Sequence, residues 1–236
     1  MIKINQDLQN LSDIISKKSP LYIVGGFVRD SLLNIENNDI DICSNLKIDE
    51  LKELLNNTNY KISNCNYNFG TCKVIGKYTY EYTTFRKDTY NLNGNHFPLS
   101  VQFCQDIKLD STRRDFTINA LYYDITNKKI IDFYNAQEDL KNKLLKALPP
   151  AENTLKFDAE RILRMIKFCA KYNLEIEQST LYWAKIFSKN IINLNKNIIN
   201  KFIESIKKLN QNQQKIVNDL LLELGFCLKN NTLKGL

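Results

Sequence analysis

The stretch from Leu21 to Cys43, LYIVGGFVRDSLLNIENNDIDIC, constrains the fold more than any other part of the chain. A short apolar run ends at Gly25 and Gly26, and the residues after the two glycines favour a helix. Asp39 and Asp41 then follow within an alternating pattern that is typical of a strand. The stretch therefore predicts a buried strand, a tight glycine turn, a helix and a second strand in close succession.

The rest of the chain divides at Pro149 and Pro150, because a proline pair stops a helix. Before the prolines strand and helix patterns alternate, and beyond them the periodic segments have helical spacing. We predict further strands at 60–64, 72–76, 78–86, 100–104 and 129–134. We predict helices at 6–17, 28–34, 48–57, 113–124, 137–148, 155–172, 178–189 and 197–228, the last with breaks. The pattern indicates a mixed α/β head followed by a small all-helical region.

Composition argues against several classes of protein. With 43% hydrophobic residues, a chain of 236 residues can bury a core, so we do not expect general disorder. The first residues lack the apolar core of a signal peptide, and no apolar run reaches the roughly 18–20 residues that cross a bilayer. The 6 cysteines form no CxxC pair and the chain has 1 histidine, so we expect a cytoplasmic protein with reduced thiols and no structural zinc site.

The positive charge of the chain is uneven. The formal net charge is +7, and the segment from Leu181 onward holds nine lysines against Glu204, Asp219 and Glu223. Two interpretations remain open at this point. The lysines either form an ordinary solvated helical surface or provide an electrostatic surface for a polyanion such as RNA.

The aspartate pair gives the opening stretch a chemical interpretation. On a strand, Asp39 and Asp41 would point to one side, roughly 6–7 Å apart at the backbone, so that both carboxylates could bind one or two hard cations. The alternative is a pair of surface aspartates at a strand edge. Gly25 and Gly26 allow close approach of a ligand to the backbone, and Arg29 adds a cation suited to phosphate oxygens. This combination favours a site for a nucleoside triphosphate with Mg²⁺.

Taken together, these residues resemble a known family. GGFVRDSLL followed by DIDI is similar to the head motif of the class II tRNA nucleotidyltransferases (CCA-adding enzymes) and bacterial poly(A) polymerases. Further similar motifs follow in the family's order and extend the resemblance from residue 21 to about residue 172: TTFRKDTY, STRRDFTINALYYD, IIDFYNAQEDLKNKLLKAL and FDAERILRMIKFCAKY.

The resemblance implies a fold and an activity. We expect an α+β head with a polymerase-β-like nucleotidyltransferase sheet and flanking helices over residues 1–148, which carries catalysis. A small all-helical neck and short body over residues 151–236 is expected to recognise the base and contact RNA. The implied reaction is template-independent addition of CCA to the 3′ acceptor end of tRNA from CTP and ATP with Mg²⁺. The 3′-hydroxyl attacks the α-phosphate, pyrophosphate leaves, and no covalent enzyme intermediate is needed.

Three carboxylates are the predicted catalytic residues. Asp39 and Asp41 are the expected Mg²⁺ ligands. Glu81 lies in YTYEYTTFR, where alternation places it on one strand face with Thr83 and Phe85. Enzymes of this chemistry often use a third carboxylate to orient or deprotonate the attacking hydroxyl, and Glu81 is our candidate. The alternative is an ordinary strand glutamate in a cross-strand pair.

The motif RRDFTINALYYD supplies further predicted nucleotide contacts. Arginines near a helix start suit a triphosphate, and Asp115 could accept a hydrogen bond from a ribose hydroxyl. Asn119 would share the helical face of Asp115. The alternative is a capped helix with surface arginines. With the glycine turn, the predicted nucleotide-binding residues of the head are Gly25, Gly26, Arg29, Arg113, Arg114, Asp115 and Asn119.

The motif FDAERILRMIKF combines an apolar helical stripe with charged neighbours. Asp158 and Arg161 offer acceptors and donors, so the pair can imitate the Watson–Crick edge of a base. The resembled family is understood to choose CTP or ATP in this way. Arg164 and Lys167 continue the basic row and are expected to face phosphates.

The chain departs from the family pattern at several positions. The usual EDxxR motif has Phe157 in place of its glutamate, which leaves the arginine without that carboxylate unless Glu160 takes its place. Ala136 stands where glycine is usual. The loop that helps the family switch from C to A addition has lost its usual charged residues and carries Asn93, Asn95 and His96 instead.

A shorter helical region is the last departure. About 65 residues follow the base-reading helix, whereas relatives have a longer body that grips the tRNA elbow. The lysine-rich helices would then hold RNA through its phosphates, and binding should be weak and sensitive to salt.

Several functions remain open from the sequence. The nearest alternatives are a partial enzyme that adds only CC or only A, and a poly(A) polymerase. A non-catalytic RNA-binding protein built on a retired transferase head, and a helical adaptor that uses only the basic tail, belong to a different class. The intact aspartate pair, GGFVRD and RRDFTINA argue against the non-catalytic RNA-binding protein, because decay would be expected at the carboxylates first. The helical adaptor is less favoured still. The sequence specifies neither the order of nucleotide addition nor the oligomeric state.

Overall fold

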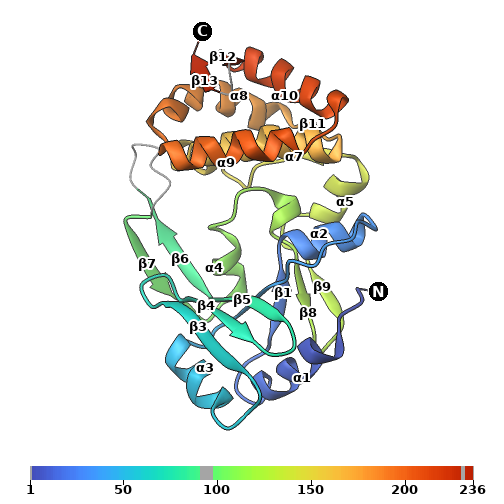
Figure 1. Ribbon diagram of the computed structural model, residues 1–236, viewed down its shortest axis with the longest axis vertical. Helices are drawn as coiled ribbons and strands as arrows, with labels where there is room; N and C mark the ends of the chain where they lie inside the picture. The colour runs from blue at the N-terminus through green and yellow to red at the C-terminus, as the bar shows by residue number, and fades with distance from the viewer. Residues whose placement is uncertain (1, 91–97, 230–231, 236) are drawn as a thin grey trace. The chain divides into compact units, whose positions relative to one another are not determined.

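The computed structural model describes residues 2–90, 98–229 and 232–235, and the chain forms two compact units (Figure 1). We call them the head unit and the helical unit. The head unit comprises Met1–Asp88, Ser100–Arg114 and Ile118–Ala136. The helical unit comprises Thr89–Leu99, Asp115–Thr117 and Gln137–Leu236.

The head unit is built on a mixed sheet of seven strands. Its order is β3-β4-β5-β2-β1-β8-β9, and the β2–β5 pair is parallel. The other pairs of this sheet are antiparallel. The strands are β1 (Tyr22–Val24), β2 (Asp41–Ser44), β3 (Lys61–Asn66), β4 (Thr71–Ile75), β5 (Thr79–Thr84), β8 (Tyr122–Asp124) and β9 (Lys129–Ile131). A separate two-stranded sheet pairs β6 (Arg86–Thr89) with β7 (Ser100–Phe103).

The predicted strand–turn–helix–strand unit is confirmed at the centre of this sheet. β1 pairs with β2 on one side and with β8 on the other, with Val24 opposite both Asp41 and Tyr122. Val24, Cys43, Phe85 and Tyr122 form a buried apolar cluster around it. Because β1 is hydrogen-bonded to a strand on each side, the glycine turn at its end is held beside the start of β2.

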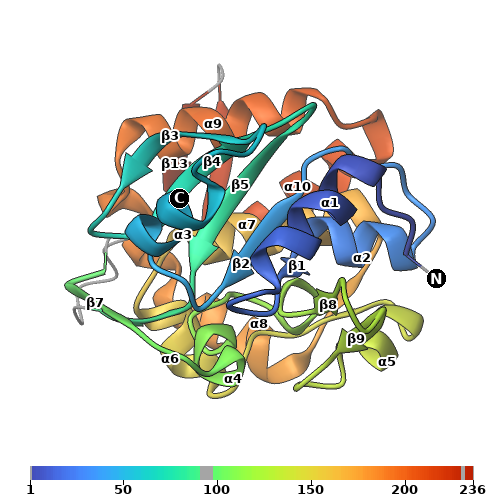
Figure 2. The ribbon, with the colours of Figure 1, turned by 90° about the horizontal axis from the view of Figure 1, so that it is seen from below.

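Helices cover the sheet with the faces that their periodicity predicts. α1 (Gln6–Ile15) buries Leu8, Leu11 and Ile15, and α3 (Ile48–Leu55) buries Leu51 and Leu55. The two helices contact each other and lie against one face of the sheet (Figure 2). α2 (Gly26–Leu32) contacts β1, and α4 (Ile107–Ser111) precedes the RRDFTINA motif. The expected α+β head with a central sheet and flanking helices is therefore confirmed.

The helical unit is organised around α7 (Glu160–Tyr172). This helix buries Ile162, Met165, Ile166 and Cys169, the apolar stripe read from the sequence, and it contacts α6, α9 and α10. The other elements are α6 (Ala151–Lys156), α8 (Gln178–Phe187), η2 (Ser188–Asn193), α9 (Lys196–Lys207), α10 (Gln211–Glu223), and the short strands β10 (Leu144–Leu145), β11 (Glu175–Ile176), β12 (Phe226–Lys229) and β13 (Thr232–Gly235). Within the described residues no helix has the length and apolar character needed to span a membrane.

The predicted helix at 113–124 is wrong. The segment runs through a short 3₁₀ turn, η1 (Thr117–Asn119), into strand β8. Phe116 forms a bridge with Ala147, and Tyr122 and Tyr123 pair with β1 and β9. These long-range backbone pairings outweigh the weak local preference for helix. Asp115 and Asn119 therefore do not share a helical face.

Several other predicted helices have different limits. The helix predicted at 137–148 is α5 (Ala136–Lys141), and β10 follows it before the prolines. The helix predicted at 155–172 breaks into α6 and α7 at residues 157–159, where the Asp158 carboxylate accepts a hydrogen bond from the Glu160 N–H. The helix predicted at 197–228 separates into α9 and α10 and ends in the hairpin β12–β13.

Pro149 and Pro150, where the sequence predicted the domain boundary, lie inside the helical unit. The functional division into a catalytic head over 1–148 and an RNA-contacting region over 151–236 stays a prediction.

Candidate active site

Asp41 and Glu81 lie opposite each other in the sheet. Asp41 begins β2, Glu81 lies in the parallel strand β5, and the two are register partners. The Glu81 N–H donates a hydrogen bond to the Ile40 carbonyl at 3.3 Å. Partners in register project to the same face of a sheet. The fold thus places two of the three predicted catalytic carboxylates on one side of adjacent strands.

Asp39 is positioned differently from the prediction. It lies in the loop before β2, so the argument that both aspartates share a strand face is wrong for this residue. Its backbone N–H donates a hydrogen bond to the Asn37 Oδ1 at 2.9 Å, and its side chain is exposed. Asp39 therefore lies in a loop that the Asn37 side chain anchors, whereas Asp41 lies at the half-buried start of a strand.

Glu81 also takes part in a cross-strand ion pair. Its carboxylate lies 3.6 Å from the Lys73 Nζ, and these two residues are register partners in β4 and β5. The Lys73 and Glu81 side chains are 42% and 60% exposed, so solvent screens the pair and it contributes little to stability. Among the described residues, no cluster of three or more His, Cys, Asp or Glu side chains is arranged to hold a metal ion. The candidate metal ligands remain the two aspartates.

Gly25 is the point where several predicted site residues meet. Its φ of +76° lies in the left-handed region that favours glycine. A Cβ placed there would lie 3.7 Å from the Arg114 Nη1, 3.7 Å from the Asn119 carbonyl oxygen and 4.0 Å from the Asp41 Oδ2. The glycine turn therefore brings a carboxylate and a guanidinium group to the same short stretch of backbone.

Arg114 is held by a buried hub that the sequence analysis missed. Its Nη2 lies 3.3 Å from the Asp110 Oδ2, and its Nε donates to the Tyr122 hydroxyl at 3.0 Å. The Tyr122 hydroxyl donates in turn to Asp110 at 2.7 Å. The guanidinium carbon also lies 5.0 Å from the centroid of the Tyr122 ring. These contacts fix the plane of the Arg114 guanidinium beside Gly25.

Asp110 is fully buried and serves both arginines of the motif. Its Oδ1 lies 2.9 Å from the Arg113 Nε and accepts a hydrogen bond from the Arg86 N–H at 3.1 Å. Burial alone would raise the pKa of Asp110, but the Arg113 and Arg114 guanidinium groups hold that pKa below its ordinary value. The available signal was the spacing of three and four residues from Asp110 to the two arginines, which follow directly after the end of α4.

Arg29 is oriented by neighbours inside the head unit. It is buried, its Nε donates to the Asp30 Oδ1 at 2.8 Å, and its Nη1 donates to the Asn119 Oδ1. Asp30 also accepts a hydrogen bond from the Asn37 Nδ2 at 2.9 Å. A chain of polar contacts therefore runs from Asn119 through Arg29, Asp30 and Asn37 to the backbone of the loop that carries Asp39.

In the helical unit, Asp115 and Arg164 form an ion pair. The Arg164 Nε donates to the Asp115 Oδ2 at 2.7 Å, and the Asp115 Oδ1 accepts from the Phe116 N–H at 2.8 Å. The Asp115 carboxylate raises the pKa of Arg164. Asp115 is buried, whereas the Arg164 side chain is 44% exposed, so the arginine extends from a fixed carboxylate toward the surface. Lys167 is half-buried one turn farther along α7.

Asp158 and Arg161 are close to each other, as their spacing predicts. Both are buried, and the Arg161 Nε lies 3.5 Å from the Asp158 Oδ2. The other Asp158 oxygen accepts the Glu160 N–H at 2.9 Å, so the carboxylate is anchored at the start of α7. The positions of Asn93, Asn95 and His96 lie outside the described residues.

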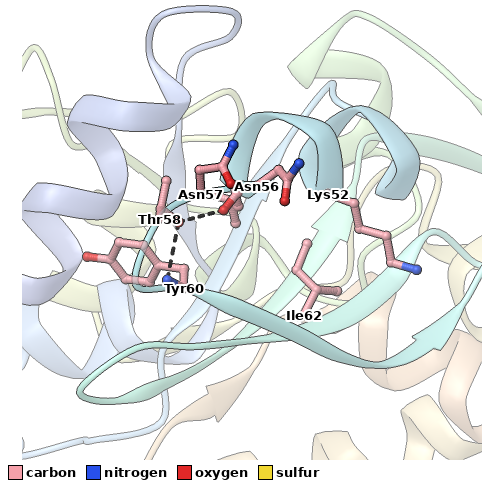
Figure 3. Close-up of a pocket in the computed structure, with 7 residues that line it drawn as sticks. Lys52, Asn56, Asn57, Thr58, Tyr60 and Ile62 are labelled. Carbon is pink, nitrogen blue, oxygen red and sulfur yellow. Dashed lines mark hydrogen bonds between the residues drawn. The ribbon is translucent and has the colours of Figure 1, made fainter.

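A polar pocket lies elsewhere in the head unit. It has a volume of about 270 Å³ and is lined by the end of α3, the following turn and the start of β3, with Lys52, Thr58, Tyr60 and Ile62 among its residues (Figure 3). Thr58 ties the turn together, since its hydroxyl donates to the Leu55 carbonyl and accepts the Tyr60 N–H. None of its lining residues is a predicted site residue, so we do not assign the chemistry to it.

Comparison with known proteins identifies the family of this chain. A family model described as the poly(A) polymerase head domain matches residues 21–146. The CCA-adding enzyme of Oceanobacillus iheyensis is 36% identical over 185 residues, which cover 78% of this chain and 45% of that enzyme. The chain thus spans about half the length of the curated relatives it matches.

Solved structures show the same fold. The Bacillus stearothermophilus CCA-adding enzyme in complex with CTP has a TM-score of 0.78 at 24% identity, over 92% of this chain and 51% of that one. A tRNA nucleotidyltransferase complexed with a primer tRNA and an incoming ATP analog has a TM-score of 0.73 at 27% identity, over 91% of this chain and 60% of that one. Because the family match covers more than half of the sequence and the motifs occur in the family's order, this chain belongs to the poly(A) polymerase head domain family.

Proposed function

We propose that this chain is a template-independent RNA nucleotidyltransferase that adds CCA to tRNA 3′ ends from CTP and ATP with Mg²⁺. The observation that carries the proposal is the meeting of the Asp41 carboxylate and the Arg114 guanidinium at Gly25. This arrangement combines a metal ligand, a phosphate-binding cation and a backbone open to close approach. The relatives that match the chain are CCA-adding enzymes, which supports the choice of reaction.

Asp39 and Asp41 fit a divalent magnesium ion by their chemistry. Both offer carboxylate oxygens, the ligands that Mg²⁺ prefers, and neither is fully buried. When bound, the metal would neutralise charge on the phosphate oxygens. The loop carrying Asp39 is anchored through Asn37 and Asp30, so we propose that this polar chain keeps the two carboxylates within reach of a shared cation.

The arginines of the head are proposed to bind the triphosphate. Arg114 is held in one plane by Asp110 and Tyr122, which prepares it to receive phosphate oxygens without further ordering. Arg113 shares the same carboxylate. Arg29 supports Asn119 from within the unit, so its proposed contribution includes shaping this part of the turn. Glu81 is proposed to orient the attacking 3′-hydroxyl, in competition with its ion pair to Lys73.

The helical unit is proposed to recognise the sugar and the base. Asp115 would accept a hydrogen bond from a ribose hydroxyl, and Arg164 and Lys167 would face phosphates. Asp158 and Arg161 present acceptors and donors side by side at the start of α7, which supports a role as a protein substitute for a pairing base.

The proposed partners are the 3′ acceptor end of tRNA, CTP and ATP, in the cytoplasm. One structural neighbour is a complex with CTP and another with a primer tRNA and an ATP analog. The lysines from Leu181 onward are proposed to contact RNA phosphates. Such contacts should weaken as salt rises.

The test is an extension assay on end-labelled tRNA that lacks CCA. The protein is incubated with Mg²⁺ and CTP, ATP, both or neither, and products are resolved at single-nucleotide steps. Three additions that stop and require both nucleotides are expected. Two additions with CTP alone, or one on a CC-ended primer, would show a partial enzyme, and an unbounded ladder with ATP would show a poly(A) polymerase.

A matched pair of double variants separates catalysis from binding. Asp39→Asn with Asp41→Asn should abolish extension while RNA binding is retained. Asp13→Asn with Asp49→Asn changes two exposed aspartates of the same unit and should leave extension unchanged. Equal extension by the two double variants would contradict the proposed function.

A further inference from the structure

Phe157, which stands where the family motif usually has glutamate, packs against another aromatic ring. It ends α6 just before α7 begins. Its ring lies parallel to that of Tyr90, with 6.3 Å between the centroids and 5° between the planes. Both residues belong to the helical unit, although the head segments Ser100–Arg114 and Ile118–Ala136 lie between them in sequence.

Arg161 lies against the same Tyr90 ring. Its guanidinium carbon is 5.4 Å from the ring centroid, and its Nη2 donates to the Tyr90 hydroxyl at 3.4 Å. Its Nη1 donates to the Thr154 carbonyl at 3.3 Å, and its Nε faces Asp158 at 3.5 Å. Arg161 is therefore contacted along three of its nitrogens and by an aromatic ring.

These contacts determine the orientation of a planar group. A guanidinium that reads a base must present its donors in one plane, and a long arginine side chain has several rotatable bonds to hold. A glutamate at position 157 could have restrained it through a charged hydrogen bond. Here the Tyr90 ring restrains it by a cation–π contact, and the flat face of Phe157 restrains the Tyr90 ring.

We propose that Tyr90 and Phe157 are positioning residues that hold Arg161 in its base-reading orientation and so set nucleotide selection. The proposal rests on the proposed function, because it assigns Arg161 to the base. It identifies an aromatic pair as the replacement for the missing carboxylate. The 3.4 Å hydrogen bond is long, so the ring contributes more to the orientation than the hydroxyl does.

The experiment measures selectivity for the first added nucleotide. The quantity is the ratio of kcat/KM for CTP to kcat/KM for UTP on a tRNA that lacks CCA. The variants are Tyr90→Ala, Phe157→Leu and Tyr90→Phe. Tyr78→Ala and Tyr78→Phe repeat the tyrosine changes at an exposed site of the head, and Phe187→Leu repeats the phenylalanine change in the stacked pair of Trp183 and Phe187.

The expected loss of nucleotide selectivity for each variant depends on which contact to Arg161 or Tyr90 it removes. Tyr90→Ala should lower the ratio about tenfold, which is at the low end of what one well-placed base contact contributes to discrimination. Phe157→Leu should have an intermediate effect, and Tyr90→Phe should lower the ratio about twofold because the ring remains. The control variants should keep the ratio of the unchanged protein. The double variant Tyr90→Ala with Phe157→Leu should lose no more than Tyr90→Ala alone, because Phe157 acts through Tyr90.

The outcomes separate this inference from the proposed function. If the unchanged protein extends no tRNA, the proposed function falls and the inference falls with it. If the unchanged protein selects CTP and the Tyr90 and Phe157 variants keep its ratio while losing rate for both nucleotides equally, the pair is merely structural and only the inference is overturned. A double variant whose loss is the product of the two single losses would also overturn it. Tyr90→Phe and Phe157→Leu are conservative enough to decide the matter if Tyr90→Ala does not fold.

Discussion

The chain holds two arginines in position by different means. In the head unit, Arg114 shares the fully buried Asp110 with Arg113 and Tyr122. In the helical unit, Arg161 lies 3.5 Å from the Asp158 carboxylate and also contacts the Thr154 carbonyl and the Tyr90 ring. In the first arrangement several partners converge on one buried carboxylate, whereas in the second several contacts of different kinds surround one buried guanidinium. A substitution at the head site should therefore lower the free energy of unfolding more than a substitution at the α7 site does.

The largest expected effect is at the buried carboxylate. Asp110→Ala should lower the free energy of unfolding by about 3–5 kcal/mol, because it leaves two guanidinium groups without their buried partner. Urea unfolding followed by circular dichroism measures the loss. Asp49→Ala, at an exposed position, should change stability by less than about 0.5 kcal/mol. A small loss at Asp110 would mean that the two arginine sites do not differ in this way.

A second effect concerns the glycine where the head site converges. Gly25→Ala should cost about 1–3 kcal/mol from the left-handed backbone. It should also reduce extension, since the new Cβ would occupy the space beside Arg114 and Asp41 that the proposed nucleotide needs. Gly225→Ala is a matched control, because its φ is +83° and nothing lies within 4 Å of a Cβ there. Thermal unfolding should show similar losses for both variants, and the extension assay should show a loss for Gly25→Ala alone. Equal activity of the two would remove Gly25 from the site.

Acidification should lower the stability of the protein through the same carboxylate, that of Asp110. The pKa of Asp110 is lowered in the folded state, so its stabilising contribution is present above the unfolded value of about 3.9 and is lost as pH falls through the folded value. The stability difference between the unchanged protein and Asp110→Asn should accordingly shrink as pH falls below about 4. Urea midpoints measured from pH 7 downward would reveal it. A difference that grows on acidification has the wrong sign for this explanation.

The α7 site should show a smaller effect on stability. Tyr90→Phe removes one hydrogen bond from the charged Arg161 guanidinium, and because this bond is long at 3.4 Å its loss should cost no more than about 1 kcal/mol. Chemical denaturation of this variant beside Asp110→Ala compares the two sites directly. A cost as large as that of Asp110→Ala would show that Arg161 depends on one contact after all.

The smallest effect is expected at the exposed pair of Glu81 and Lys73. Glu81→Gln should change stability by less than about 1 kcal/mol, since both side chains are solvated. If Glu81 orients the attacking hydroxyl, extension should fall by about 10²-fold or more in spite of that small change. Lys73→Gln breaks the same ion pair and should leave extension nearly unchanged. Equal activity of the two variants would assign Glu81 to the ion pair alone.

Local patterns were sufficient for much of the fold. The apolar run, the glycines and the alternation after them predict β1, the turn, α2 and β2 within a few residues of where they lie. The apolar stripe of α7 is likewise local, because the spacing of Ile162, Met165, Ile166 and Cys169 determines which face is buried. Asp158 and Arg161 lie close together for the same reason, since residues three apart are neighbours at a helix start.

Tertiary structure decided the rest. The register that sets Asp41 beside Glu81 and the extended path of 113–124 depend on strands distant in sequence. The Asp110 hub is completed by the Tyr122 hydroxyl of β8 and the Arg86 N–H of β6. The stacking of Tyr90 on Phe157 joins residues that no local pattern relates. Sequence periodicity reports which face of an element is buried, because burial follows from the spacing of apolar side chains. It does not report which element covers that face, because the pairing energy comes from contacts that exist only once the chain has folded.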